Sequence, residues 1–214
     1  MEKFWKSHAF TGKHWDESGR HFWLWNAPDL SISGIPFSAP AVHGLSRPLV
    51  VSATNGGVKL PVDLNASRLH FLGNVTFPDG YPIIGRFGDP VGRYVIVYSD
   101  GSRQEVPLRW GLEVARSNMI SVASRVDPAT AVGERVLIYQ KDPTREVYQA
   151  RLLSVRTQPQ KIVQIECELK PATAAGHAPP PDTHHGKTGP MGAEEQVLAL
   201  FAVTAEVVVR GEPR

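Results

Sequence analysis

Alternation of apolar and polar residues along the chain predicts short β-strands. The clearest stretch is residues 93–111, RYVIVYSDGSRQEVPLRWG, in which two alternating runs flank Asp100-Gly101. These two residues tolerate the left-handed backbone that a two-residue hairpin turn needs. We therefore predict a β-hairpin here. Pro107 in its second strand has no amide donor, so this position faces away from a neighbouring strand or lies at a bulge.

Further strands are predicted on both sides of this hairpin. Apolar or alternating runs occupy residues 21–25, 30–35, 49–52, 58–64, 67–77, 134–141, 147–155, 161–170 and 196–209, and residues 112–124 form either two strands or one bent strand. Residues 49–52 and 58–64 flank Asn55-Gly56-Gly57, so we expect them to pair through a tight turn.

In the strand at residues 67–77, the pattern places different residues on the two faces. Leu69 and Phe71 lie on one face, His70 and Leu72 on the other, and Gly73 is a candidate bulge. About a dozen strands with turn signals between them predict an all-β fold, an antiparallel β-sandwich or jelly roll.

The chain is expected to form a single domain spanning residues 1–214. Residues 1–28 form an N-terminal extension with four of the five tryptophans, and residues 171–195 form a flexible insertion rich in Pro, Gly and His. Such a composition buries too little apolar surface to offset its ordering entropy. Residues 78–92 form a long loop, of the kind that is usually functional or mobile.

Charge and cysteine content narrow the function classes. Lys and Arg total 23 against 21 for Asp and Glu, a net charge of +2, and the basic residues are scattered, so we expect no nucleic-acid partner. The sequence has no transmembrane span and no signal peptide as written, so we expect no membrane partner. The single cysteine, Cys167, lies in an alternating run and is expected to be buried or half-buried.

No catalytic or metal-binding motif stands out. The sequence contains no phosphate-binding loop, His-Glu-x-x-His or Gly-x-Ser-x-Gly pattern. The histidine-rich insertion is interpreted as a solvated loop rather than a metal site, although it contains His177, Asp182, His184 and His185. We expect no cofactor; loop oxygens of Asp63, Asn65, Asp79 and Asp89 leave a structural Ca²⁺ as an alternative.

Carbohydrate binding fits the sequence better than catalysis. Sugar faces stack on aromatic rings while planar polar groups bind their hydroxyls. The candidate ligand-binding residues are Tyr81 and Arg86 in the long loop and Arg109 and Trp110 at the end of the hairpin. The competing interpretation is that the tryptophans are core residues: if Leu108 points inward then Trp110 does too, and Arg109 points outward.

Two segments carry a resemblance to a known family. The strand with Leu69, His70, Phe71 and Leu72 precedes a hairpin with Tyr94, Val95, Val97, Tyr98, Asp100, Gly101, Val106, Pro107, Leu108 and Gly111. In this order they resemble an accessory domain of large bacterial glycoside hydrolases and related secreted proteins. ISGIPF (residues 32–37) and LALFAVTAE (residues 198–206) resemble its first and last core strands.

The resemblance implies a galactose-binding-like (discoidin-like, jelly-roll) β-sandwich that binds carbohydrate without catalysis. It adds His70 to the candidate ligand-binding residues, favours a secreted or periplasmic location, and suggests a catalytic glycoside hydrolase domain as partner. Two features depart from the family pattern: Gly73 stands where a second histidine is expected, and no catalytic domain accompanies the chain.

Two alternatives have different consequences. The first is a structural β-sandwich that contacts another domain or a second copy of itself through Trp5 and Trp15. The second is a hydrolase or lyase whose site combines the long loop with His70 and a nearby glutamate. Two carboxylates, or a histidine and a carboxylate, that converge in a pocket with perturbed pKa values would favour it.

Overall fold

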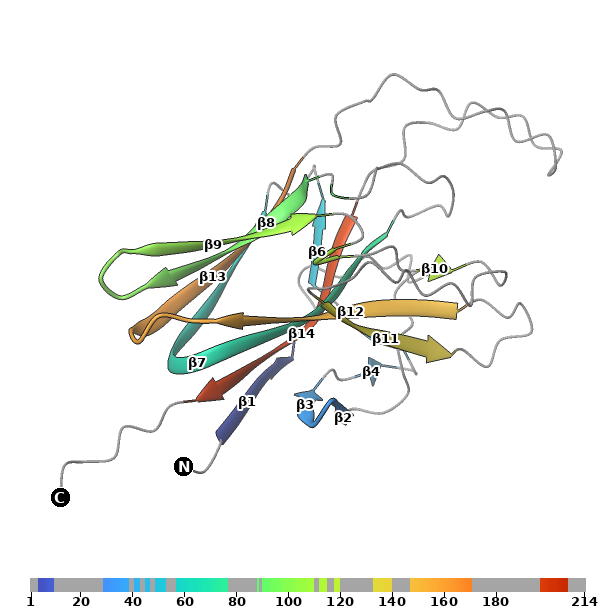
Figure 1. The fold of residues 1–214 in the computed structure, drawn as a ribbon, viewed down its shortest axis with the longest axis horizontal. Coiled ribbons are helices and arrows are strands. Elements are labelled where there is room, and N and C mark those ends of the chain that lie inside the picture. The colour runs from blue at the N-terminus through green and yellow to red at the C-terminus, as the bar shows by residue number, and fades with distance from the viewer. Residues whose placement is uncertain are drawn as a thin grey trace, which may run out of the picture.

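The computed structural model describes residues 4–9, 29–38, 41–42, 45–46, 49–52, 57–76, 88, 90–109, 112–114, 118–119, 133–139, 147–170 and 197–207. All regular structure in these residues is β-strand, as the alternation predicts. The strands are β1 (Phe4–Ala9), β2 (Asp29–Ile32), β3 (Ile35–Ser38), β4 (Ala41–Val42), β5 (Leu45–Ser46), β6 (Leu49–Ser52), β7 (Val58–Thr76), β8 (Pro90–Tyr98), β9 (Arg103–Arg109), β10 (Asn118–Met119), β11 (Gly133–Tyr139), β12 (Val147–Arg156), β13 (Lys161–Leu169) and β14 (Val197–Val207). Ten of them form one curled antiparallel sheet, a half-barrel, and β2–β3 and β4–β5 are separate pairs (Figure 1).

The 19-residue strand β7 lies in the middle of this sheet and takes part in both of its ends through different partners. Its first part pairs with β13, and its second part lies between β14 and β12. Asp63 has a left-handed backbone, with φ of 55°, and β13 has a register shift between Ile162 and Gln164. These irregularities bend the strand, so the predicted strands 58–64 and 67–77 are in fact one.

The segment that connects β12 to β13 follows the same bend. Arg156 at the end of β12 is opposite Arg68, and Lys161 at the start of β13 is opposite Asn65. Between them, Thr157 donates from its amide to the Ser67 carbonyl at 3.1 Å. The corner therefore divides the sheet into two parts. We call them the β8–β9 half (β7 residues 58–65, β13, β8 and β9) and the β12–β14 half (β7 residues 66–76, β12, β11, β14 and β1).

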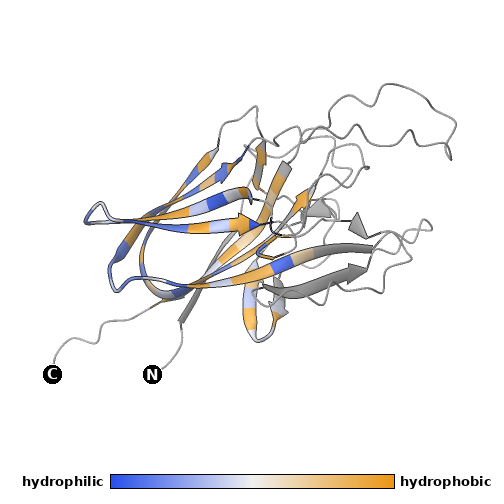
Figure 2. Ribbon diagram, turned by 45° about the horizontal axis from the view of Figure 1, so that its top comes forward, coloured by the Kyte–Doolittle hydropathy of each residue, from blue (hydrophilic) through white to orange (hydrophobic). Residues whose placement is uncertain are grey.

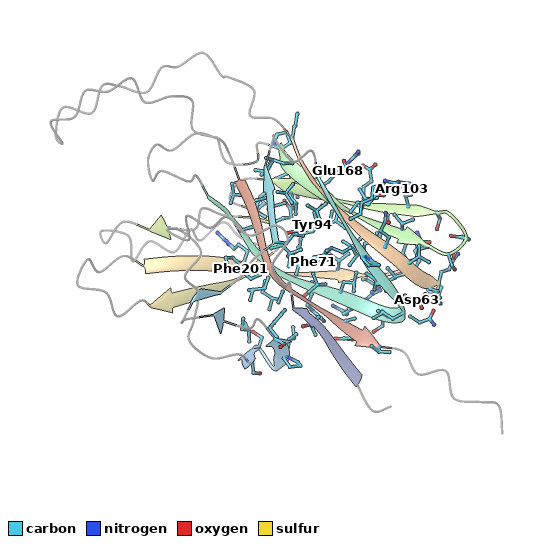
Figure 3. The ribbon with its side chains drawn as sticks, turned by 180° about the vertical axis from the view of Figure 1, so that it is seen from behind. Asp63, Phe71, Tyr94, Arg103, Glu168 and Phe201 are labelled. Atoms are coloured by element: carbon cyan, nitrogen blue, oxygen red, sulfur yellow. The ribbon has the colours of Figure 1, made fainter. Side chains whose placement is uncertain are left out.

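The main hydrophobic core lies on the inner face of both halves. Phe71 of β7 stacks on Tyr94 of β8, with ring centroids 4.4 Å apart (Figure 3). Leu69, Ile96, Leu108, Ile165 and Cys167 are buried in the same cluster. Figure 2 shows hydrophobic and hydrophilic residues alternating along these strands. Burial of Cys167 is as predicted, and it raises the pKa of the thiol.

A second apolar layer covers the opposite face of the β12–β14 half. Leu72, Leu152 and Ala202 share a row across β7, β12 and β14, and all three are buried. The β2–β3 hairpin lies against β14, where Thr204 donates from Oγ1 to the Pro36 carbonyl at 2.7 Å. Phe37 of β3 is 1% exposed. This half of the sheet therefore has apolar surface buried on both faces.

The β8–β9 hairpin is confirmed, but its turn is not the predicted two-residue turn. β8 ends at Tyr98 and β9 begins at Arg103, so the connection has four residues. Gly101 alone is left-handed, with φ of 85°, and its amide bonds the Tyr98 carbonyl at 3.0 Å. Asp100 stabilises the turn differently from the prediction, since its carboxylate accepts from the Ser102 amide at 2.9 Å.

Pro107 lies on β9, whose pairing within the described residues is with β8 alone, consistent with its missing donor.

Two pairing predictions are wrong. β6 pairs with β14 rather than with residues 58–64, which pair with β13. Gly73 is not a bulge: the extra residue, Phe201, lies on β14, opposite the step between Gly73 and Leu72. Gly73 instead permits close approach, because a Cβ there would lie 2.8 Å from the Ala199 carbonyl oxygen.

Other segments differ in detail from the predictions. Leu112 and Glu113 form a turn rather than a strand, because the amides of Leu112 and Val114 bond the Arg109 carbonyl. β1, inside the predicted extension 1–28, pairs with β14. The expected strand at residues 21–25 and the insertion 171–195 lie outside the described residues. In the part of the chain that the structure describes, no helix has the length and apolarity of a membrane span.

Candidate functional site

Three polar side chains lie in one row across the β12–β14 half. Ser154 of β12 and Thr204 of β14 are each directly opposite His70 of β7. Residues directly opposite across antiparallel strands point to the same face. We call Ser154, His70 and Thr204 the polar row. It is next to the buried row of Leu72, Leu152 and Ala202, and it therefore lies at the edge of the second apolar layer.

His70 links a hydroxyl to a carboxylate. Its side chain is 3% exposed; Nδ1 lies 2.8 Å from Ser154 Oγ, and Nε2 lies 3.3 Å from Glu206 Oε1. The other oxygen of Glu206 accepts from Ser67 Oγ at 3.1 Å. In the tautomer whose Nε2–H donates a hydrogen bond to Glu206, the unprotonated Nδ1 accepts one from the Ser154 hydroxyl. The hydrogen bonds of His70 to Ser154 and Glu206 therefore fix the orientation of the Ser154 hydroxyl, and Ser154 itself is exposed.

Beyond the polar row lies a charged row. Arg68 of β7 is directly opposite Arg156 of β12 on one side and Glu206 of β14 on the other. Arg156 is exposed and Arg68 is half-buried. Among the described residues, neither guanidinium has a hydrogen-bond or ion-pair partner. Two arginines with the same charge thus face each other beside the exposed hydroxyl of Ser154.

The outer face of the β8–β9 half is also charged, but its groups pair with one another. Glu166 Oε2 accepts from Arg103 at 2.5 Å, and Glu166 Oε1 lies 3.7 Å from Lys59 Nζ. The Arg103 hydrogen bond lowers the pKa of Glu166. Arg93 donates to Glu168 at 2.6 Å and to Glu105 at 2.9 Å. The hydrogen bond to Glu168 raises the pKa of Arg93.

The structure separates the predicted site residues that it describes. His70 is in the polar row, whereas Arg109 ends the outer strand β9 and holds Glu113, with Nε 3.1 Å from Oε2. Arg109 points outward as predicted, with a side chain 43% exposed, but its guanidinium is engaged in the ion pair with Glu113. Tyr81, Arg86 and Trp110 lie outside the described residues.

Within the described residues, no group of three His, Cys, Asp or Glu side chains is arranged to hold a metal ion. Of the oxygen ligands considered for Ca²⁺, Asp63 bonds Lys161 Nζ at 2.6 Å. Asp79 and Asp89 are outside the described residues, as are His177, Asp182, His184 and His185.

Sequence reasoning missed Ser154, Glu206, Arg68 and Arg156. His70 is separated from Ser154 by 84 positions and from Glu206 by 136, so no local motif contains them. One signal was available: in the stretch SRLHFLG, Arg68 and His70 share the face opposite Leu69 and Phe71. Polar residues on that face mark the point where the buried layer ends.

The fold and these rows define an all-β protein with a curled antiparallel sheet and a polar site on its outer face. Comparisons with protein families, curated proteins and solved structures gave no match.

Proposed function

We propose that this protein is a non-catalytic carbohydrate-binding module that acts beside a polysaccharide-degrading enzyme. The observation that carries the proposal is the hydrogen-bonded chain from Ser154 through His70 to Glu206, with distances of 2.8 and 3.3 Å. It presents an oriented hydroxyl on a rigid strand, next to two arginines. Sugar recognition uses such fixed polar groups to bind ring hydroxyls.

The sequence resemblance supports the same proposal. It implies a galactose-binding-like β-sandwich, and two of its segments meet at the site: His70 lies in the first, and Thr204 and Glu206 lie in the closing segment LALFAVTAE. The sandwich or jelly-roll description is part of this proposal. The polar row would then lie on the outer face of one of its layers.

Calorimetry against a panel of plant, algal and host glycans tests the proposal. We expect at least one glycan to bind, and we expect Ser154→Ala to weaken it by about tenfold, the effect of one well-made polar contact. Ser102→Ala is the matched control, because Ser102 lies on the β8–β9 turn, where its hydroxyl contacts Gln158. Lack of binding to every glycan would reject the proposal.

A second candidate, a serine hydrolase, is favoured by the same three residues. Ser154 is exposed, His70 is buried and Glu206 is 13% exposed, the order of a nucleophile, base and orienting acid. In such a reaction Ser154 Oγ would attack an ester carbonyl while its proton moved to His70 Nδ1. His70 would then return the proton to the leaving alkoxide, and water would release the acyl group.

The strand setting ranks this candidate second. Ser154 lies inside β12, where backbone amides serve the sheet ladder, whereas acyl transfer needs donors aimed at the developing oxyanion. A fluorophosphonate reagent followed by mass spectrometry separates the two functions. The binding module predicts no adduct on Ser154. An adduct that forms in the native protein and disappears in His70→Gln would favour the hydrolase.

A further inference from the structure

We propose that the glycan is acidic, and that its carboxylate or sulfate group binds between Arg68 and Arg156. This inference rests on the proposed carbohydrate function and specifies its ligand class. The structural reason is the direct opposition of the two arginines across β7 and β12. Opposed side chains on one face have Cβ atoms about 5 Å apart. One carboxylate or sulfate group has enough oxygen atoms to accept from both guanidinium groups at that spacing.

Electrostatics make this pair different from the three arginines of the β8–β9 half. Like charges directly opposite each other destabilise a sheet. Arg93, Arg103 and Arg109 each bind a carboxylate of the protein. Arg68 and Arg156 have no such partner among the described residues, so a bound anion would relieve their repulsion.

Glu206 does not take that place. It is opposite Arg68 on the β14 side, but its two carboxylate oxygens accept from His70 and Ser67. The anion is therefore expected on the β12 side of Arg68, away from this carboxylate. Ser154 lies there, two residues before Arg156 and on the same face. Its hydroxyl can contact a ring hydroxyl next to the acidic group.

Paired glycans that differ in charge test the inference. For the carboxylate, the probes are polygalacturonate and its fully methyl-esterified form. For the sulfate, they are a sulfated galactan and the same galactan after desulfation. We expect the protein to bind the charged member of one pair at least tenfold more tightly than its neutral form. The pair that shows this difference identifies the acidic group.

Variants locate the binding. Arg68→Gln and Arg156→Gln should each weaken the acidic glycan about tenfold and reduce the dependence of affinity on salt. Arg93→Gln is the control, since it removes the same charge from a half-exposed arginine on the β8–β9 half. It should change affinity less than about twofold. Thermal unfolding of each variant verifies that it is folded.

Each other outcome has a distinct meaning. Equal binding of charged and neutral glycans, with Ser154→Ala still weakening both, would overturn the acidic ligand and leave the carbohydrate function standing. An equal loss in Arg93→Gln would show general electrostatic attraction and overturn the site. Equal binding to single-stranded DNA or to vesicles with anionic lipid would overturn it too. Failure of every glycan to bind would reject the function and the inference together.

Discussion

The outer faces of the two halves of the sheet are both charged, but their charges are arranged differently. On the β8–β9 half, Glu166 is held by Arg103, and Arg93 is held between Glu105 and Glu168. On the β12–β14 half, Arg68 and Arg156 face each other. The first arrangement is satisfied within the protein, whereas the second is the basis of the proposed anion site. The pattern of partners, rather than the number of charges, distinguishes a candidate site from a solvated face.

The two faces also differ in what covers them. Val95 is on the outer face of the β8–β9 half, directly opposite Glu166 and Glu105, yet it is fully buried. Long charged side chains can cover an apolar neighbour with their aliphatic parts. On the other half, β3 covers the sheet with Phe37. The β8–β9 half thus buries an apolar residue among charged ones, whereas a hairpin covers the other half.

The largest expected effect tests the covering hairpin. Phe37→Ala should lower the free energy of unfolding by about 3–5 kcal/mol, because it empties a fully buried aromatic site. Phe71→Ala in the main core is the reference and should cost a similar amount. Chemical denaturation measures both. A loss below about 1 kcal/mol in Phe37→Ala would mean that β3 does not cover the second apolar layer.

The corner between the halves should give an intermediate effect. Asp63 has φ of 55°, a conformation that costs an L-residue roughly 1–2 kcal/mol and is tolerated best by Asn, Asp and Gly. Asp63→Val should therefore be about 1–2 kcal/mol less stable than Asp63→Asn. Both variants lose the negative charge that pairs with Lys161, so the backbone is expected to account for most of their difference. Equal denaturation midpoints would show that the corner is not left-handed.

Local patterns predicted most of the strands but few of their neighbours. Alternation located β8, β9, β12, β13 and β14 to within a few residues, since a half-buried strand repeats every two positions. It divided β7 in two because the apolar positions change phase, from the even positions 58–64 to Leu69 and Phe71. Pairing of β6 with β14 joins segments nearly 150 positions apart, and nothing local indicates it.

The candidate site was predictable in one residue only. His70 was found through resemblance, and its alternation with Leu69 and Phe71 gave its face. Its partners Ser154 and Glu206 come from β12 and β14, whose registers with β7 depend on the corner and on the bulge at Phe201. Register is a property of the assembled sheet, so the hydroxyl and the carboxylate could not be identified beforehand.

A smaller effect, on pH dependence, tests the closed charge pattern of the β8–β9 half. The Arg103 hydrogen bond lowers the pKa of Glu166 below its usual 4.5. A carboxyl with a lowered pKa stabilises the fold fully above its unfolded value, and this stabilisation is lost as the pH falls through the folded pKa. Between about pH 5 and pH 3, wild type should therefore lose thermal stability more steeply than Glu166→Gln. Parallel curves would contradict the assigned ion pair.

The smallest effect is expected for Glu105→Gln on the same face. Glu105 is 58% exposed and its partner Arg93 is 43% exposed, so water screens their attraction. Arg93 also forms an ion pair with Glu168 at 2.6 Å, and Glu105→Gln removes neither of these two residues. We expect no measurable change in the denaturation midpoint. A decrease in the midpoint as large as that of Glu166→Gln at neutral pH would show that the ion pairs act as one cooperative network. The stability of the β8–β9 half would then depend on each of its charges, including the exposed ones.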